Sequence, residues 1–239
     1  MSTNARSKEL YTKAKQTYSD KVLIHSRTVV EKEGYVSTGI LSHIEGEMME
    51  IEMTEYKSFD LGNPVEMTIY SPVGIQRLQS TVIGKAEGSI AVIFPVRALS
   101  GLEEKRESPR VQIDHKGTMK KTIIETRELS TGPENFEFIE DMELAIRNIS
   151  LSGLGFIVAE GPRLKTNERL EAVLSLGFEL PCWLEIIRYD SDGAQSFYGA
   201  RFCDLDGLQQ RALRAFILRE QVAAYYRRKQ EKASDNRTH

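Results

Sequence analysis

The sequence predicts a mainly β protein with two barrel-like domains and a C-terminal helix. Three observations support this prediction. Short apolar stretches alternate with turn residues along most of the chain, at a spacing typical of barrels and sandwiches. A crowded charged segment at residues 101–106 interrupts this series, and the end of the chain has helical periodicity instead. With 239 residues, of which 40% are hydrophobic, the chain is long enough for two cores.

The first domain is expected at residues 1–101. Residues 7–18 carry apolar side chains at helical spacing, which predicts a short amphipathic helix packed on the domain that follows. The periodicity then becomes strand-like, and turns such as Glu33-Gly34 separate the strands. The predicted strands are residues 22–29, 35–42, 48–53, 65–71, 76–83 and 89–96.

The second domain is expected at residues 102–231, followed by a flexible polar tail at residues 232–239. Its predicted strands are residues 110–113, 118–127, 136–149, 155–158, 169–176, 180–189 and 195–203, and the polar residues 128–135 are expected to form a hairpin tip. Asp206 and Gln209 resemble a capping box at the start of the terminal helix. The predicted apolar face of that helix comprises Leu208, Ala212, Ala215, Phe216, Arg219 and Val222.

Composition and motifs exclude several classes of protein. The formal net charge of −3 disfavours an electrostatic grip on DNA or RNA. The apolar stretches are far shorter than the ~20 residues that span a bilayer, and the start lacks the layout of a secretory signal. A cytoplasmic protein without a transmembrane segment is therefore expected. The phosphate-binding-loop and nucleophile-elbow motifs are missing, and no histidine pairs with a cysteine at metal-ligand spacing. We therefore expect neither catalytic residues nor a metal site.

Two short polar motifs stand apart from this background. Two arginines flank three residues in the charged segment, and an asparagine, a serine and a glycine follow within residues 148–153. Arginine presents a planar set of donors that matches phosphate oxygens and guanine edges. Amide and hydroxyl groups complete polar recognition, and glycine permits a close backbone approach. These groups together suit a purine nucleotide with anionic phosphates. The candidate ligand-binding residues are Arg106, Arg110, Asn148, Ser150 and Gly153, with Lys105 and Ser152 as additional candidates.

Each motif taken alone also has an ordinary structural explanation. The two arginines fit a charged linker that pairs with neighbouring glutamates, and the Asn–Ser–Gly group fits a tight turn between strands. Their order and separation, in a strand-rich region that ends in a helix, favour the ligand-binding interpretation.

The motifs together resemble the R-x-x-x-R … [D/N]-x-S-x-x-G signature of PilZ domains, which are cyclic di-GMP receptors of bacteria. The segment Leu154-Gly155-Phe156 and the late strand at residues 198–202 agree with the same family. The resemblance covers about residues 102–226. It implies a six-stranded antiparallel barrel with a C-terminal helix. The preceding domain is similar in pattern and position to the N-terminal, split-barrel-like domain of the flagellar-brake type of PilZ protein.

The resemblance also implies a function. Arg106 and Arg110 would bind phosphates and guanine edges, and Asn148 and Ser150 would recognise a guanine. Gly153 would keep the turn free of a side chain. Cyclic di-GMP would be a ligand, with no other cofactor, and its binding would change the interdomain arrangement. The altered surface would then regulate a protein partner, as similar proteins do with the flagellar motor machinery.

Two alternative functions remain open at this point. Some proteins of the family act as adaptors that bind protein partners without a nucleotide. Split barrels also host flavin enzymes, although residues 22–96 have no distinctive phosphate-binding feature. Asparagine at position 148 stands where aspartate is commoner in the signature, and the interval from residue 110 to residue 148 is long.

Overall fold

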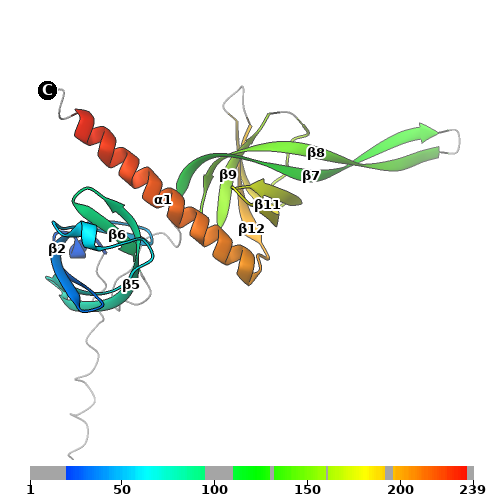
Figure 1. The fold of residues 1–239 in the computed structure, drawn as a ribbon. Helices are drawn as coiled ribbons and strands as arrows, with labels where there is room; N and C mark the ends of the chain where they lie inside the picture. Colours follow the sequence, from blue (N-terminus) through cyan, green and yellow to red (C-terminus); the bar gives the residue numbers. More distant parts are fainter. Residues whose placement is uncertain (1–19, 95–109, 130–131, 160, 192–195, 236–239) are drawn as a thin grey trace, which may run out of the picture. The chain divides into compact units, whose positions relative to one another are not determined.

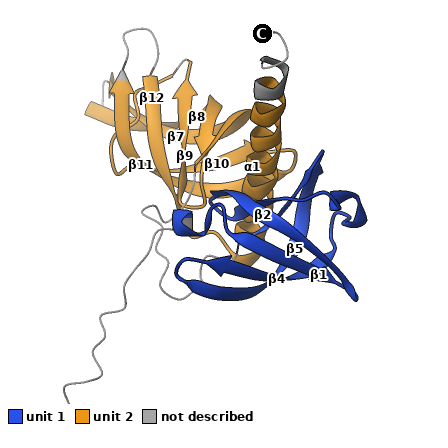
Figure 2. Cartoon of the chain, turned by 90° about the vertical axis from the view of Figure 1, so that its left-hand side faces the viewer, with its two compact units in different colours: residues 1–107 blue, residues 108–239 orange. Residues whose placement is uncertain are grey.

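The chain divides into two compact units, Met1–Glu107 and Ser108–His239 (Figure 2). The structure, a computed structural model, describes residues 20–94, 110–129, 132–159, 161–191 and 196–235. The predicted helix at residues 7–18 and the predicted domain boundary after residue 101 lie outside the described residues. No helix within the described part of the chain is both long enough and apolar enough to cross a membrane.

The first unit is a closed six-stranded antiparallel barrel, which confirms the predicted fold class (Figure 1). The strands follow one another around the barrel in the order β1-β2-β3-β6-β5-β4. Alternate residues point inward, and among them Leu41, Ile51 and Ile69 are fully buried. The elements of this unit are η1 (Asp20–Leu23), β1 (Arg27–Lys32), β2 (Tyr35–Glu45), β3 (Met48–Glu52), η2 (Tyr56–Ser58), β4 (Pro64–Ser71), β5 (Gly74–Ala86) and β6 (Ser89–Ile93).

The predicted first strand at residues 22–29 is wrong in its first half. Residues 20–23 form a short 3₁₀ helix, and β1 begins only at Arg27. Between the two elements His25 has a left-handed backbone with φ of 68°, which an extended strand does not allow. The apolar side chain of Leu23 still reaches the barrel core, where it is fully buried. The apolar pattern alone did not distinguish a strand from a 3₁₀ helix, since either element can bury Leu23.

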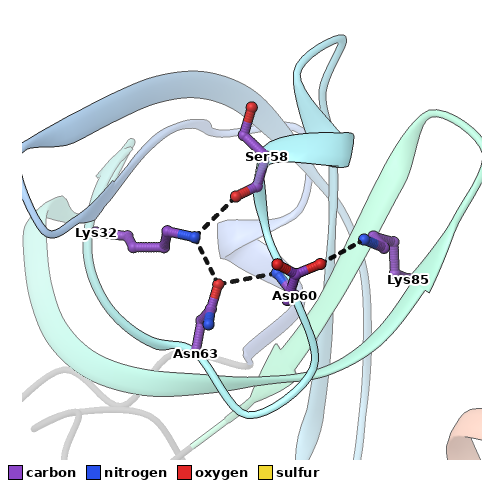
Figure 3. A network of polar contacts seen from close by, with 5 residues as sticks. All are labelled: Lys32, Ser58, Asp60, Asn63 and Lys85. Atoms are coloured by element: carbon purple, nitrogen blue, oxygen red, sulfur yellow. Dashed lines mark hydrogen bonds and ion pairs between the residues drawn. The ribbon is translucent and has the colours of Figure 1, made fainter.

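A polar network ties the loop between β3 and β4 onto the first barrel (Figure 3). The Lys32 ammonium group donates to the Ser58 carbonyl at 2.9 Å and to the Asn63 side-chain oxygen at 2.7 Å. The same Asn63 oxygen accepts from the Asp60 amide at 2.9 Å. Lys85 pairs with the Asp60 carboxylate at 3.0 Å, which lowers the pKa of that carboxyl. These contacts fix the loop against β1 and β5.

The second unit is also a closed six-stranded antiparallel barrel, in the order β10-β11-β12-β9-β8-β7, followed by one helix. This arrangement confirms the six-stranded barrel and the C-terminal helix expected for the second domain. The elements are β7 (Val111–Leu129), β8 (Gly132–Ile149), β9 (Gly153–Val158), β10 (Arg169–Ser175), β11 (Glu179–Ser191), β12 (Ser196–Cys203) and α1 (Gly207–Asp235).

Strands β7 and β8 are much longer than predicted. The two strands predicted at residues 110–113 and 118–127 are one strand. A hairpin joins β7 and β8 within the predicted tip at residues 128–135, but most of that tip belongs to the strands themselves. Pairing continues without a register shift from His115↔Ile146 to Leu129↔Gly132. Figure 1 shows the two strands running on together, away from the other strands of their barrel.

Helix α1 begins with the predicted capping box. The Asp206 carboxylate accepts from the amides of Leu208 and Gln209, both at 2.8 Å, and the Gln209 side chain accepts from the Asp206 amide at 2.9 Å. The predicted apolar face is wrong at most of its positions: Leu208 is exposed, and the buried apolar residues of the helix are Leu213, Phe216 and Ile217. The ring of Phe216 meets the His115 ring of β7 edge to face, 5.3 Å between centroids. The helix runs four residues beyond the predicted domain end at residue 231, and residues 236–239 of the predicted tail lie outside the described residues.

Candidate functional site

A hollow of about 210 Å³ opens on the outer face of the second barrel, where β8, β9, β12 and β11 lie side by side. Its lining mixes polar and apolar residues and is rich in arginine and glycine. The lining residues are Arg110, Asn148, Ser150, Ser152, Gly153, Leu154, Gly155, Ile187, Arg188, Gly199, Ala200 and Arg201.

The hollow gathers every predicted ligand-binding residue that the structure describes. Arg110 comes from the segment just before β7, where it is exposed, and Asn148 lies near the end of β8. Ser150 and Ser152 come from the β8–β9 turn, and Gly153 is the first residue of β9. Two motif residues that are 38 positions apart in sequence thus line one surface. The remaining candidates, Lys105 and Arg106, lie outside the described residues.

The β8–β9 turn is held by its own serine. The Ser150 amide donates to the Gly153 carbonyl at 2.8 Å, and the Ser150 hydroxyl donates to the same carbonyl at 3.2 Å. The Ser150 hydroxyl also lies 3.2 Å from that of Ser152. The Phe202 amide of β12 donates to the Ser152 carbonyl at 3.1 Å, which ties the turn to the neighbouring strand. Because a hydroxyl has two lone pairs, Ser150 retains acceptor capacity for a ligand.

Gly153 is required by a close backbone approach and not by an unusual turn conformation. Gly153 pairs with Arg201 of β12. A Cβ at this position would overlap the carbonyl oxygen of Ala200, which is backbone and has no rotamer to adopt. The prediction offered either a close approach or a turn, and the close approach is the one found.

A second feature of the site is a row of four residues across four strands. Asn148 of β8 pairs with Gly155 of β9, Gly155 pairs with Gly199 of β12, and Gly199 pairs with Arg188 of β11. A Cβ on Gly155 would lie 2.8 Å from Nδ2 of Asn148, and one on Gly199 would lie 2.8 Å from Nε of Arg188. The two polar side chains therefore lie over glycine backbone. The Arg188 guanidinium also stands over the Phe197 ring, 5.5 Å from its centroid.

Two β-bulges turn these polar side chains outward. The β8–β9 register shifts between Ile146 and Asn148, and the β11–β12 register shifts between Ile186 and Arg188. Ile146 and Ile186 are fully buried, so each bulge changes the side-chain alternation directly after a core residue. The bulges thus place Asn148 and Arg188 on the outer face in the same row.

Sequence reasoning missed Arg188 and Arg201. Arg201 is held by the Glu185 carboxylate, with 2.7 Å between Nη2 and Oε2. The hydrogen bond from Arg201 lowers the pKa of the Glu185 carboxyl, so Glu185 is ionised at neutral pH and fixes the guanidinium beside the hollow. Arg201 belongs to the late strand already noted for its family resemblance, but Arg188 carries no local signal, since it joins the site only through strand pairing.

The chemistry of the hollow is that of an anion site with hydrogen-bonding selectivity. Three guanidinium groups, from Arg110, Arg188 and Arg201, line it together with an amide and two hydroxyls. Guanidinium groups bind phosphate oxygens in a bidentate manner and stack on purine rings. The amide of Asn148 presents one acceptor and one donor group, which allows it to bind the edge of a base.

The fold and the site define a two-barrel protein whose second barrel carries an arginine-lined site on its outer face. Residues 104–219 match the family described as PilZ domain, and the chain therefore carries a PilZ domain. The matched segment includes both motifs and all the lining residues of the hollow. No protein of curated function matches the chain in sequence.

Several solved structures are similar to this chain at low sequence identity. The inhibitor of motility of Bacillus subtilis, MotI/DgrA, is 14% identical with a TM-score of 0.39, and the match covers 84% of this chain and 98% of that chain. YcgR from Escherichia coli, solved in complex with c-di-GMP, is 13% identical with a TM-score of 0.37, covering 88% of each chain. The MrkH–c-di-GMP complex of K. pneumoniae is 14% identical with a TM-score of 0.35, covering 85% of this chain and 90% of that chain.

Proposed function

We propose that this chain is a cyclic di-GMP receptor that acts by binding and not by catalysis. The observation that carries the proposal is the convergence of Arg110, Asn148, Ser150, Ser152 and Gly153 on one hollow of a PilZ domain. The complete motif disfavours the alternative of a nucleotide-independent adaptor.

The chemistry of the hollow supports this ligand. Cyclic di-GMP carries two anionic phosphodiesters and two guanines. Arg110 and Arg201 supply charge-assisted donors for phosphate oxygens and for the O6 and N7 atoms of guanine. Asn148 and Ser150 supply the neutral groups that bind the remaining edge of a guanine. The stacked position of Arg188 over an aromatic ring leaves its planar group suited to a flat base.

The hollow is smaller than a typical site for a ligand of this size, so further residues are needed to complete the proposed site. Sites that bury a drug-sized ligand measure roughly 300–1,000 Å³, and the hollow formed by described residues is about 210 Å³. We assign the remaining contacts to Arg106 and Lys105, which lie four and five positions before Arg110 in sequence. The proposed receptor thus binds its ligand through both the arginine motif at residues 106–110 and the Asn–Ser–Gly motif at residues 148–153.

The proposed output is a change in the relation of the two barrels that regulates a protein partner, with flagellar motility as the process controlled. This part follows from the two-barrel organisation together with the family resemblance. It is tested by small-angle scattering with and without the ligand, where a change in radius of gyration is expected, and by swimming assays of cells that lack the protein.

Calorimetric titration with cyclic di-GMP tests the binding. The double variant Arg110→Ala with Arg188→Ala removes a charge-assisted interaction of about 1.5–3 kcal/mol and a stacking contact of about 0.5–2 kcal/mol, so affinity should fall at least ~30-fold. The matched control is Arg147→Ala: Arg147 is adjacent in sequence to Asn148 but pairs with Asp114 at 2.6 Å and does not line the hollow. The control should bind as the natural chain does.

Two results would contradict the proposal. The natural chain giving no heat with cyclic di-GMP would favour the adaptor function. Equal affinities of the natural chain and the double variant would locate binding away from the hollow.

A further inference from the structure

The outer part of the β7–β8 hairpin forms a second surface, distinct from the hollow. We call this part the arm; it comprises residues 122–129 of β7 and 132–139 of β8, paired throughout. The partner strand β10 pairs with β7 only over residues 116–120, and β9 pairs with β8 only over residues 144–149. The arm therefore extends as two strands without a further neighbour among the described residues (Figure 1).

The arm is long for an isolated hairpin. Eight residue pairs at about 3.3 Å each project roughly 26 Å from the barrel. Its root is fixed, because the Lys121 ammonium group donates to the Arg163 carbonyl at 2.8 Å and Met142 is buried in the barrel core. A two-stranded hairpin is at best marginally stable by itself in water, so an arm of this length is expected to gain from a further contact.

The two faces of the arm differ. Residues directly opposite in an antiparallel pair share a face. On one face the Arg127 guanidinium covers two aromatic rings, at 5.4 Å from Phe136 and 5.6 Å from Phe138, and pairs with Glu125 at 2.9 Å. The Arg127 guanidinium thus covers part of this face, on which Phe138 and Leu129 are 43% and 44% exposed.

The other face, which we call the isoleucine face, keeps its apolar groups exposed. Ile139 lies opposite Thr122 and Ile124 lies opposite Glu137, so the two isoleucines are diagonal neighbours. Their exposed fractions are 72% and 59%. Contiguous apolar surface on a protruding element is typical of an interaction site.

Charge identifies the kind of partner. The arm has four carboxylates and one guanidinium, a net charge of −3, and Glu128 and Glu137 lie on the isoleucine face itself. Carboxylates beside exposed isoleucines disfavour nucleic acid and anionic membranes, and they also disfavour a second copy of the same arm. We propose that the isoleucine face docks a protein partner that presents lysine or arginine side chains around an apolar patch.

This docking surface does not depend on nucleotide binding. Asn148 and Ile139 lie on the same strand, nine residues or about 30 Å apart. Variants of the arm thus leave the hollow intact, and failure of one proposal does not decide the other.

Photo-crosslinking from the full-length chain in cells tests the proposal. The variant Ile139→p-benzoylphenylalanine should form an adduct with a partner protein, whereas Glu125→p-benzoylphenylalanine, on the opposite face, should not.

The captured protein is then purified, and its affinity for the natural chain and for variants of the arm is measured. The double variant Ile124→Thr with Ile139→Thr should bind at least tenfold more weakly, and Glu128→Lys with Glu137→Lys should weaken binding to a similar extent. Binding of the natural chain should also fall as salt rises.

The matched control is Ile75→Thr, at a 60% exposed isoleucine on β5 of the first barrel. Threonine keeps the β-branched shape that strands favour, so both threonine variants should unfold at the temperature of the natural chain, and Ile75→Thr should bind the partner normally. Adducts with a second copy only, equal adducts from both positions, or no adduct from position 139 would overturn the proposal. Unchanged affinity of either double variant would do the same.

Discussion

A methyl group at Gly155 should close part of the hollow without unfolding the barrel. The added Cβ would lie 2.6 Å from Cζ of Phe197 and 2.8 and 2.9 Å from the side-chain nitrogen and oxygen of Asn148. All three atoms are at the ends of side chains that rotate, so the strand backbone need not move. The Asn148 amide must turn away from its position above the glycine, and the site loses that group.

The effects on stability and on binding should therefore differ. Two displaced rotamers, those of Phe197 and Asn148, cost about 0.5–1.5 kcal/mol each, and alanine recovers about 0.4–1 kcal/mol through the unfolded state. The free energy of unfolding should fall by about 1–1.5 kcal/mol, which is ~5 °C in Tm for a domain of this size. Loss of two hydrogen bonds from Asn148 at about 1 kcal/mol each should weaken cyclic di-GMP binding about 30-fold.

The comparison variant is Gly153→Ala, where the obstruction is the Ala200 carbonyl oxygen and no side chain can give way. Strands β9 and β12 must separate there, at a cost of about 3 kcal/mol, so Tm should fall by ~10 °C or more. Thermal unfolding and calorimetric titration of both variants measure the two effects. Natural affinity in Gly155→Ala would refute the assignment of the hollow, and a stability loss as large as that of Gly153→Ala would refute the geometric reasoning.

Four further predictions concern the same site. Asn148→Asp should retain cyclic di-GMP binding in calorimetry, because a carboxylate accepts the same hydrogen bonds, whereas Asn148→Ala should bind weakly while it stays folded. Glu185→Gln should lower both affinity and Tm, because Glu185 holds Arg201. The pKa of Glu185 in the folded state is lowered from 4.5, so the ion pair stabilises the fold fully above pH 4.5. The Tm difference between the variant and the natural chain should vanish as the pH falls through this lowered pKa. The emission of Trp183, the single tryptophan, should change on binding, because Trp183 lies on the same strand two residues from Glu185; no change at saturation would contradict a site next to Arg201. Amide hydrogen exchange in residues 101–110 should slow when the ligand is added, and unchanged exchange there would contradict a role for Arg106 and Arg110 in binding.

The barrels could be predicted from the sequence because the alternation of apolar and polar residues within each strand shows which side chains face the core. Alternating apolar residues in β4, such as Val65, Met67 and Ile69, all point into the core, and the same pattern recurs in β10. The hairpin that forms the arm was expected, but its full length could not be predicted in this way. With solvent on both faces, residues 128–135 have no alternation of apolar and polar side chains, so the polar stretch was assigned to the tip. Cross-strand pairing, which sequence reasoning does not see, extends both strands to Leu129 and Gly132.

The candidate site was predictable only where its residues form a local motif. Asn148, Ser150 and Gly153 lie within six positions, so their spacing is visible in the chain. Arg188 and the glycine pair Gly155–Gly199 are distant in sequence, and only the strand order and two bulges bring them to one row. An arginine on the exposed face of a strand has no local feature that distinguishes it from an ordinary surface residue.

The most direct test of the account is a titration of the isotope-labelled full-length chain with cyclic di-GMP, followed by the amide chemical shifts. Binding in the hollow predicts that the largest shift changes cluster at residues 148–155 on β8 and β9, around Gly199 on β12 and at Arg188 on β11. The arm at residues 122–139 should be unaffected. Shift changes that cluster elsewhere, or no changes at saturating ligand, would contradict the claim that this PilZ domain binds cyclic di-GMP through the hollow.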